Sequence, residues 1–141
     1  MKKIRIEITS TVEDMDEAGL TVSSDKTHST AEGTASLYDG ELRISYTESD
    51  ENGRTDSLIV ISKDKTQVKR TGAVEYDFLF LEGKNTSALY SVPPYSFDTE
   101  IYTRRIRSDF NGCTGRLTLI YDMTIGGAKK KTRMNIGVSE I

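Results

Sequence analysis

The stretch GRLTLIYDMTIGG, residues 115–127, contains the strongest strand signal of this chain. Apolar side chains occupy every second position of its central part, at Leu117, Leu119, Tyr121, Met123 and Ile125. Successive side chains of a β-strand point to opposite faces, so this spacing predicts a strand with one face on a hydrophobic core. The two glycines that end the stretch suit the positive φ angles of a tight hairpin turn. The stretch therefore predicts an antiparallel β-protein.

The same alternation recurs throughout the chain. It is clear in KIRIEIT (3–9), ELRISY (41–46), VEYDFLFL (74–81) and MNIGV (134–138). Asp-Gly in YDGE (38–41) and Asn-Gly in DENGR (50–54) are typical hairpin turns. We count about ten strands and almost no helix, with turns spaced as in an antiparallel sandwich or barrel. A single up-and-down barrel of about 8–10 strands is the preferred prediction. Pairing of the first strand with the last would remove both open edges of the sheet.

Three segments depart from regular alternation. The acidic, turn-rich VEDMDEAGLTVSSDKT (12–27) is interpreted as a loop. Gly33, inside an expected strand, predicts a sharp bend or the close approach of another backbone. Pro93 and Pro94 cannot donate to a central ladder, so they predict a corner between two antiparallel strands. All three features suit a small barrel.

Length and composition predict one domain, residues 1–141, that needs neither disulfides nor metals to fold. Hydrophobic residues make up 35% and charged residues 29%, and the single cysteine, Cys113, has no partner for an internal disulfide. We find no apolar stretch suited to a signal peptide and none long enough to span a membrane. A cytoplasmic location without a membrane span is therefore expected.

Residues for catalysis or cofactor binding are scarce. His28 is the single histidine, and both it and Cys113, which we expect to be an exposed thiol in a turn, are interpreted as incidental. Asp98 and Glu100 share a face that we expect to point outward. No zinc-site spacing, phosphate loop or dinucleotide motif is present. We therefore expect no catalytic residue, metal or cofactor.

Charge is unevenly divided along the chain. Residues 1–60 carry 6 Lys/Arg and 13 Asp/Glu, whereas residues 61–141 carry 13 and 9, within a net charge of −3. The halves could attract each other inside the domain or present complementary surfaces to a protein partner or a second copy. The basic runs RRIR (104–107) and KKKTR (129–133) lie in an acidic protein, so no nucleic-acid partner is predicted.

Several segments resemble a known family, the YwiB-like bacterial domain of unknown function with a calycin-type β-barrel. They are GTASLYDGELRISYTES (33–49), RTG (70–72), YSVPPYSF (90–97), IYT (101–103) and the stretch at 115–127. The family pattern at the proline corner is Thr-Pro-Tyr-Gly, whereas this chain has a second proline and Ser96 in place of the glycine. The resemblance implies a lipocalin-like barrel and no agreed activity.

One ligand site follows from the wider calycin resemblance, because related barrels hold a carboxylate with an arginine and a tyrosine. It would combine Arg105 with Tyr46 or Tyr121, provided that the phase of Phe97 and Ile101 continues to Arg105. A bulge between Ile101 and Ile106 would restore the apolar phase and turn Arg105 outward.

These patterns leave three functions open. The first is binding of a small apolar or amphipathic carboxylate inside the barrel, and the second is a protein-interaction module whose barrel is filled. The third is an enzyme built on carboxylates and tyrosines, which no motif selects.

Overall fold

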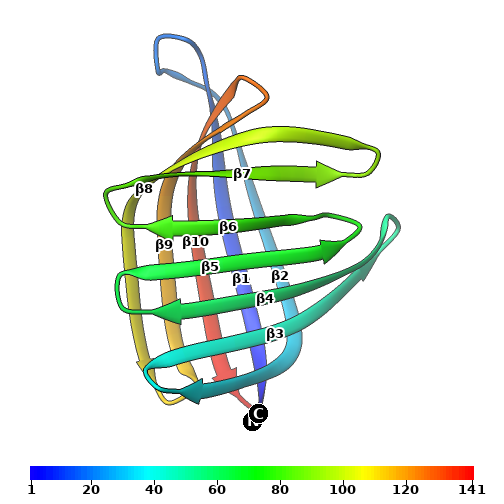
Figure 1. The fold of residues 1–141 in the computed structure, drawn as a ribbon, viewed down its shortest axis with the longest axis vertical. Helices are drawn as coiled ribbons and strands as arrows, with labels where there is room; N and C mark the ends of the chain where they lie inside the picture. The colour runs from blue at the N-terminus through cyan, green and yellow to red at the C-terminus, as the bar shows by residue number, and fades with distance from the viewer.

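The computed structural model describes residues 1–141 as an all-β protein of ten strands (Figure 1). The strands are β1 (Lys2–Met15), β2 (Thr21–Tyr38), β3 (Glu41–Asp50), β4 (Gly53–Ser62), β5 (Lys65–Gly72), β6 (Tyr76–Leu81), β7 (Asn85–Val92), β8 (Tyr95–Asn111), β9 (Thr114–Ile125) and β10 (Ala128–Glu140). The predicted class and strand number are thus confirmed. No segment forms a helix of the length and apolarity that a membrane crossing would require.

All ten strands form one antiparallel sheet in the order β6-β5-β4-β3-β2-β1-β10-β9-β8-β7. The first and last strands pair from Ile4↔Glu140 to Met15↔Lys129, which confirms the predicted contact between them. In Figure 1, β3 to β7 cross in front of the steeper strands β1, β9 and β10, and β8 first runs beside β7 and then bends down along β9. The sheet therefore folds back on itself as a nearly closed barrel.

The two edge strands of the sheet, β6 and β7, meet at a seam that is only partly bonded. Glu75 and Ser91 exchange two backbone hydrogen bonds of 2.8 Å. The Thr86 hydroxyl donates to the Leu79 carbonyl at 2.6 Å. No continuous β6–β7 ladder forms, so the pairing of β1 with β10 moves the edges to this seam and does not remove them.

The acidic segment 12–27 is not the expected loop, because β1 continues to Met15 and β2 begins at Thr21. Hydrogen bonds bridge the two strands, as from the Ser23 hydroxyl to Asp14 at 2.7 Å. The turn is closed by the Asp16 carboxylate, which accepts the N–H groups of Ala18 and Leu20 at 2.9 Å. Most side chains of this hairpin stay at least partly solvated on both faces, so its strands lack apolar alternation.

Gly33 occupies the place where β2 turns to pair with β3. A Cβ added there would lie 2.1 Å from the Ser45 carbonyl oxygen and 2.9 Å from the Tyr46 Cβ. Only glycine permits this approach, which confirms the predicted contact with another backbone. The bend leaves residues 21–32 of β2 paired with β1 alone.

The barrel encloses a hydrophobic core of 19 buried residues. Leu117, Leu119, Tyr121 and Met123 are buried as the alternation predicts. The Phe80 ring lies against the Tyr121 ring, with centroids 4.7 Å apart. The interior of the barrel is therefore packed with side chains where these core residues lie.

The proline pair forms the predicted corner. Pro93 and Pro94, joined by a cis peptide bond, connect β7 to β8, and their neighbours Val92 and Tyr95 pair across the turn. Farther along β8 the register with β9 shifts between Thr103 and Arg105, so the predicted bulge is confirmed.

Candidate functional site

The β8 bulge determines where Arg105 points. Thr103 pairs with Tyr121 and Arg105 with the next residue, Ile120, which leaves Arg104 as the extra residue. The bulge changes which alternate residues of β8 point inward after Thr103. Ile106 is therefore partly buried and Arg105 is exposed. Tyr46 and Tyr121 are both buried. The structure does not bring Arg105 together with either tyrosine, because the inserted residue turns the arginine outward.

A different arginine, Arg70, faces the interior. It follows Thr66 and Val68 at alternate positions of β5, and both of these are buried. The exposed fraction of its side chain is 25%. Thr66, Val68 and Arg70 alternate in TQVKRTG (66–72), so the sequence did contain a signal for an inward-facing Arg70. A cation at a strand end is, however, more often solvated.

Arg70 is held by groups from three other strands. Its Nε donates to the Ser57 hydroxyl at 3.2 Å, and its Nη2 donates to the Glu48 carboxylate at 3.1 Å. Its guanidinium carbon lies 6.0 Å from the centroid of the Tyr76 ring. Together with Tyr46, whose hydroxyl interacts with Ser57, these residues are named the Arg70 cluster. Its members are Tyr46, Glu48, Ser57, Arg70 and Tyr76.

Burial sets the protonation states in this cluster. It raises the pKa of Tyr76 to about 12, against the lowering effect of the Arg70 guanidinium. Burial also raises the pKa of Tyr46. Burial alone would lower the pKa of Arg70, but interactions with Tyr76, Tyr46 and Glu48 outweigh it and the pKa is raised. At neutral pH the cluster therefore offers a fixed cation beside two neutral phenols.

Deeper in the barrel, two buried hydroxyls have no hydrogen-bond partner. They belong to Thr66 and Thr103, which are both fully buried. Thr66 pairs with Phe80 and Thr103 with Tyr121, so the hydroxyls flank the contact between those two rings. Burial raises the pKa of the Tyr121 phenol, which interacts with Thr132. The packed interior thus contains polar atoms whose desolvation is not offset.

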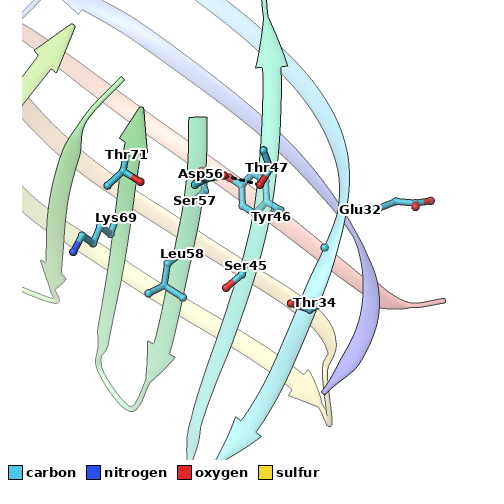
Figure 2. Close-up of a pocket in the computed structure, with 11 residues that line it drawn as sticks. Glu32, Thr34, Ser45, Tyr46, Thr47, Asp56, Ser57, Leu58, Lys69 and Thr71 are labelled. Atoms are coloured by element: carbon cyan, nitrogen blue, oxygen red, sulfur yellow. Dashed lines mark hydrogen bonds between the residues drawn. The ribbon is translucent and has the colours of Figure 1, made fainter. Parts of the chain in front are cut away.

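A recess of about 620 Å³ lies over β2 to β5 (Figure 2). Its wall is mostly polar, and it includes Thr34, Ser45, Leu58, Lys69 and Thr71. The Thr47 hydroxyl donates to the Asp56 carboxylate at 2.7 Å, as the dashed line in Figure 2 marks. Tyr46 and Ser57 belong both to this wall and to the Arg70 cluster. The recess and the cluster therefore share β3 and β4. The wall side chains Ser45, Thr47 and Leu58 alternate with Tyr46 and Ser57, so they face the other side of the sheet from the cluster.

The remaining candidates stay apart from the cluster. His28 is exposed, and its Nε2 lies 2.8 Å from the Glu7 carboxylate. Cys113 is buried in the core, so the expectation of an exposed thiol is wrong. It is a member of the hydrophobic core although it belongs to the turn between β8 and β9. Glu100 is exposed and accepts a hydrogen bond from the Ser87 hydroxyl at 2.9 Å. No group of three or more His, Cys, Asp or Glu side chains is placed to hold a metal ion.

Comparison with solved structures shows the same fold elsewhere. The crystal structure of ywiB protein from Bacillus subtilis matches with a TM-score of 0.80 and 22% identity, over 96% of this chain and 91% of that chain. At this identity the match supports the fold alone.

Comparison of sequences identifies the family. The uncharacterized beta-barrel protein YwiB of Bacillus subtilis (strain 168) is 30% identical over 86 residues, and the match spans 61% of each chain. The model of the family described as Domain of unknown function (DUF1934) matches residues 6–136. The resemblance noted in the sequence is thereby confirmed, and the chain belongs to the DUF1934 family of β-barrel proteins of unknown function.

Proposed function

We propose that the barrel binds a small amphipathic carboxylate at the Arg70 cluster. One observation carries the proposal: a largely buried arginine lies beside two phenols, and its counter-ion is partly exposed to solvent. That counter-ion is Glu48, whose side chain has an exposed fraction of 31%. A ligand carboxylate would replace the Glu48 carboxylate on the guanidinium.

The surroundings of Arg70 suit such a ligand. Arginine binds a carboxylate through a planar fork of N–H donors, and a low local dielectric strengthens these bonds. Aromatic rings supply an apolar wall, since Tyr76 stacks on Phe78 at 3.9 Å and on Tyr90 at 5.7 Å between centroids. The apolar part of the ligand would lie against this stack.

The packed core limits the size of the ligand. Ile44 and Phe80 fill the barrel below the cluster and are both almost completely buried. A long acyl chain would have to displace them. The proposal is therefore restricted to short ligands, whose entry would pass the seam that the Glu75–Ser91 bridge holds.

Titration with octanoate tests the proposal. Backbone amide chemical shifts near Arg70 should change on addition of octanoate and remain constant with octanol, which lacks the carboxylate. Arg70→Gln should weaken binding by about tenfold or more, because it removes a charge-assisted bond of about 1.5–3 kcal/mol. Arg105→Gln removes an exposed arginine far from the cluster and should leave the affinity unchanged.

A second variant guards against misfolding of Arg70→Gln. Glu48→Gln leaves the arginine in place and removes the competing carboxylate, so octanoate should bind several-fold more tightly. Equal affinity of Arg70→Gln, Glu48→Gln and the unmodified protein for octanoate would reject the site.

A second candidate function, protein interaction, is favoured by a different observation. The interior is packed, and unpaired arginines gather on the outer surface of β8 and β10.

A further inference from the structure

Three arginines lie together on the outer surface without any ion-pair partner. Arg105 and Arg107 come from β8 and Arg133 from β10, and all three are exposed. None takes part in any of the seven ion pairs of the protein. Their positive charge is therefore not neutralised by a direct contact.

The strand register explains why these arginines remain unpaired. Arg105 lies opposite Ile120, and Arg107 lies opposite Thr118. Arg133 lies between Ile120 and Thr11. Each cross-strand neighbour is uncharged, so no carboxylate lies directly opposite any of the three. Asp109 follows Arg107 on the same face of β8 but forms no ion pair with it.

Several acidic residues lie on the same surface, and two of them, Asp122 and Glu7, contact other partners. Asp122 pairs with Arg104 at 2.6 Å. Asp109 lies opposite Arg116, and Glu13 lies opposite Lys131. Glu82 accepts the Ile106 N–H at 3.4 Å. A local excess of positive charge thus remains in a protein of net charge −3.

This surface is hollowed by three adjoining recesses of about 570, 290 and 210 Å³. Their floor is formed by Ile120 and by Thr118, whose hydroxyl donates to Asn135 at 2.9 Å. We name the three recesses and the bordering arginines the basic groove. Its positive side chains are Lys63, Arg107, Arg116, Lys131 and Arg133, with Arg105 at the border, and its negative side chains are Glu7, Glu13, Asp64 and Asp109. Six positive charges therefore face four negative ones.

We propose that the basic groove docks an extended acidic segment of a partner protein. Alternate side chains of an extended peptide lie about 7 Å apart, which is also the separation of Arg105 and Arg107 along β8. Arg133, two strands away from Arg105, is about 10 Å across the groove. Carboxylates at alternate positions could therefore reach both walls, while an apolar side chain covers Ile120.

Single-stranded nucleic acid fits this groove less well. Its binding usually combines phosphate contacts with bases stacked on aromatic side chains. The residues that line the three recesses include no aromatic side chain. The negative net charge would also oppose the approach of a long polyanion.

Fluorescence anisotropy with a labelled peptide of alternating Glu and Ser residues tests the proposal. Substitution of Gln for Arg105, Arg107 and Arg133 together should weaken binding by about tenfold or more, because exposed charge pairs add up over the three sites. The control replaces Lys2, Lys65 and Lys84 by Gln, all exposed and outside every ion pair. It changes the net charge equally and should alter the affinity by less than about twofold.

The other outcomes would overturn the proposal. Equal losses in both triple variants would mean attraction by net charge alone. Tighter binding of oligothymidylate of the same charge, dependent on the same arginines, would assign the groove to nucleic acid. Absence of peptide binding at low salt would exclude an acidic segment as the occupant.

Discussion

Gly33→Ala should destabilise the barrel because the new methyl group meets a backbone carbonyl. The added Cβ would lie 2.1 Å from the Ser45 oxygen, whereas carbon and oxygen in contact normally stay more than about 3 Å apart. The oxygen belongs to β3, so relief requires separation of the β2 and β3 backbones. We expect a loss of about 2–4 kcal/mol in the free energy of unfolding, from overpacking and weakened ladder bonds.

Urea denaturation and calorimetry measure this loss. For a domain of this size the melting temperature should fall by about 6–14 °C. Gly137→Ala is the matched control, because its added Cβ would meet only the Glu7 oxygen at 4.0 Å. It should be neutral or stabilising by up to about 1 kcal/mol. Equal stability of the two variants would refute the argument from close backbone approach.

Two further predictions concern buried hydroxyls. Thr103→Val removes a buried hydroxyl without a hydrogen-bond partner and should raise the free energy of unfolding by about 1 kcal/mol in urea denaturation. A decrease in the free energy of unfolding would contradict the absence of a partner for this hydroxyl. Burial raises the pKa of Tyr76 from 10.0 to about 12, so the folded state favours its neutral form. This stability is complete below the unfolded pKa of 10.0 and is lost as the pH rises toward 12. In a titration at 295 nm, Tyr76→Phe should remove a late-ionising phenol, and an unchanged curve at high pH would contradict the shift.

Local periodicity was enough to predict most of the barrel. Leu117, Leu119 and Tyr121 alternate because one face of β9 meets the core, and this information lies within a few neighbouring residues. The bulge in β8 was predictable for the same reason, since Ile101 and Ile106 fall in opposite phases. The hairpin at 12–27 was missed because its strands carry no alternation. Strand length there depends on pairing with β10, which is remote in sequence.

The amino-acid sequence was sufficient to predict an all-β fold, the corner at the two prolines and the close backbone approach at Gly33. It also predicted, for most strands, which alternate residues face the core. Tertiary structure decided that the barrel is left partly open between β6 and β7, and which arginine faces inward. Arg105 points outward because Thr103 and Arg105 pair with adjacent residues of β9. Arg70 points inward and donates hydrogen bonds to Glu48 and Ser57, which belong to two other strands. Such choices depend on contacts between residues far apart in the chain, which local periodicity does not encode.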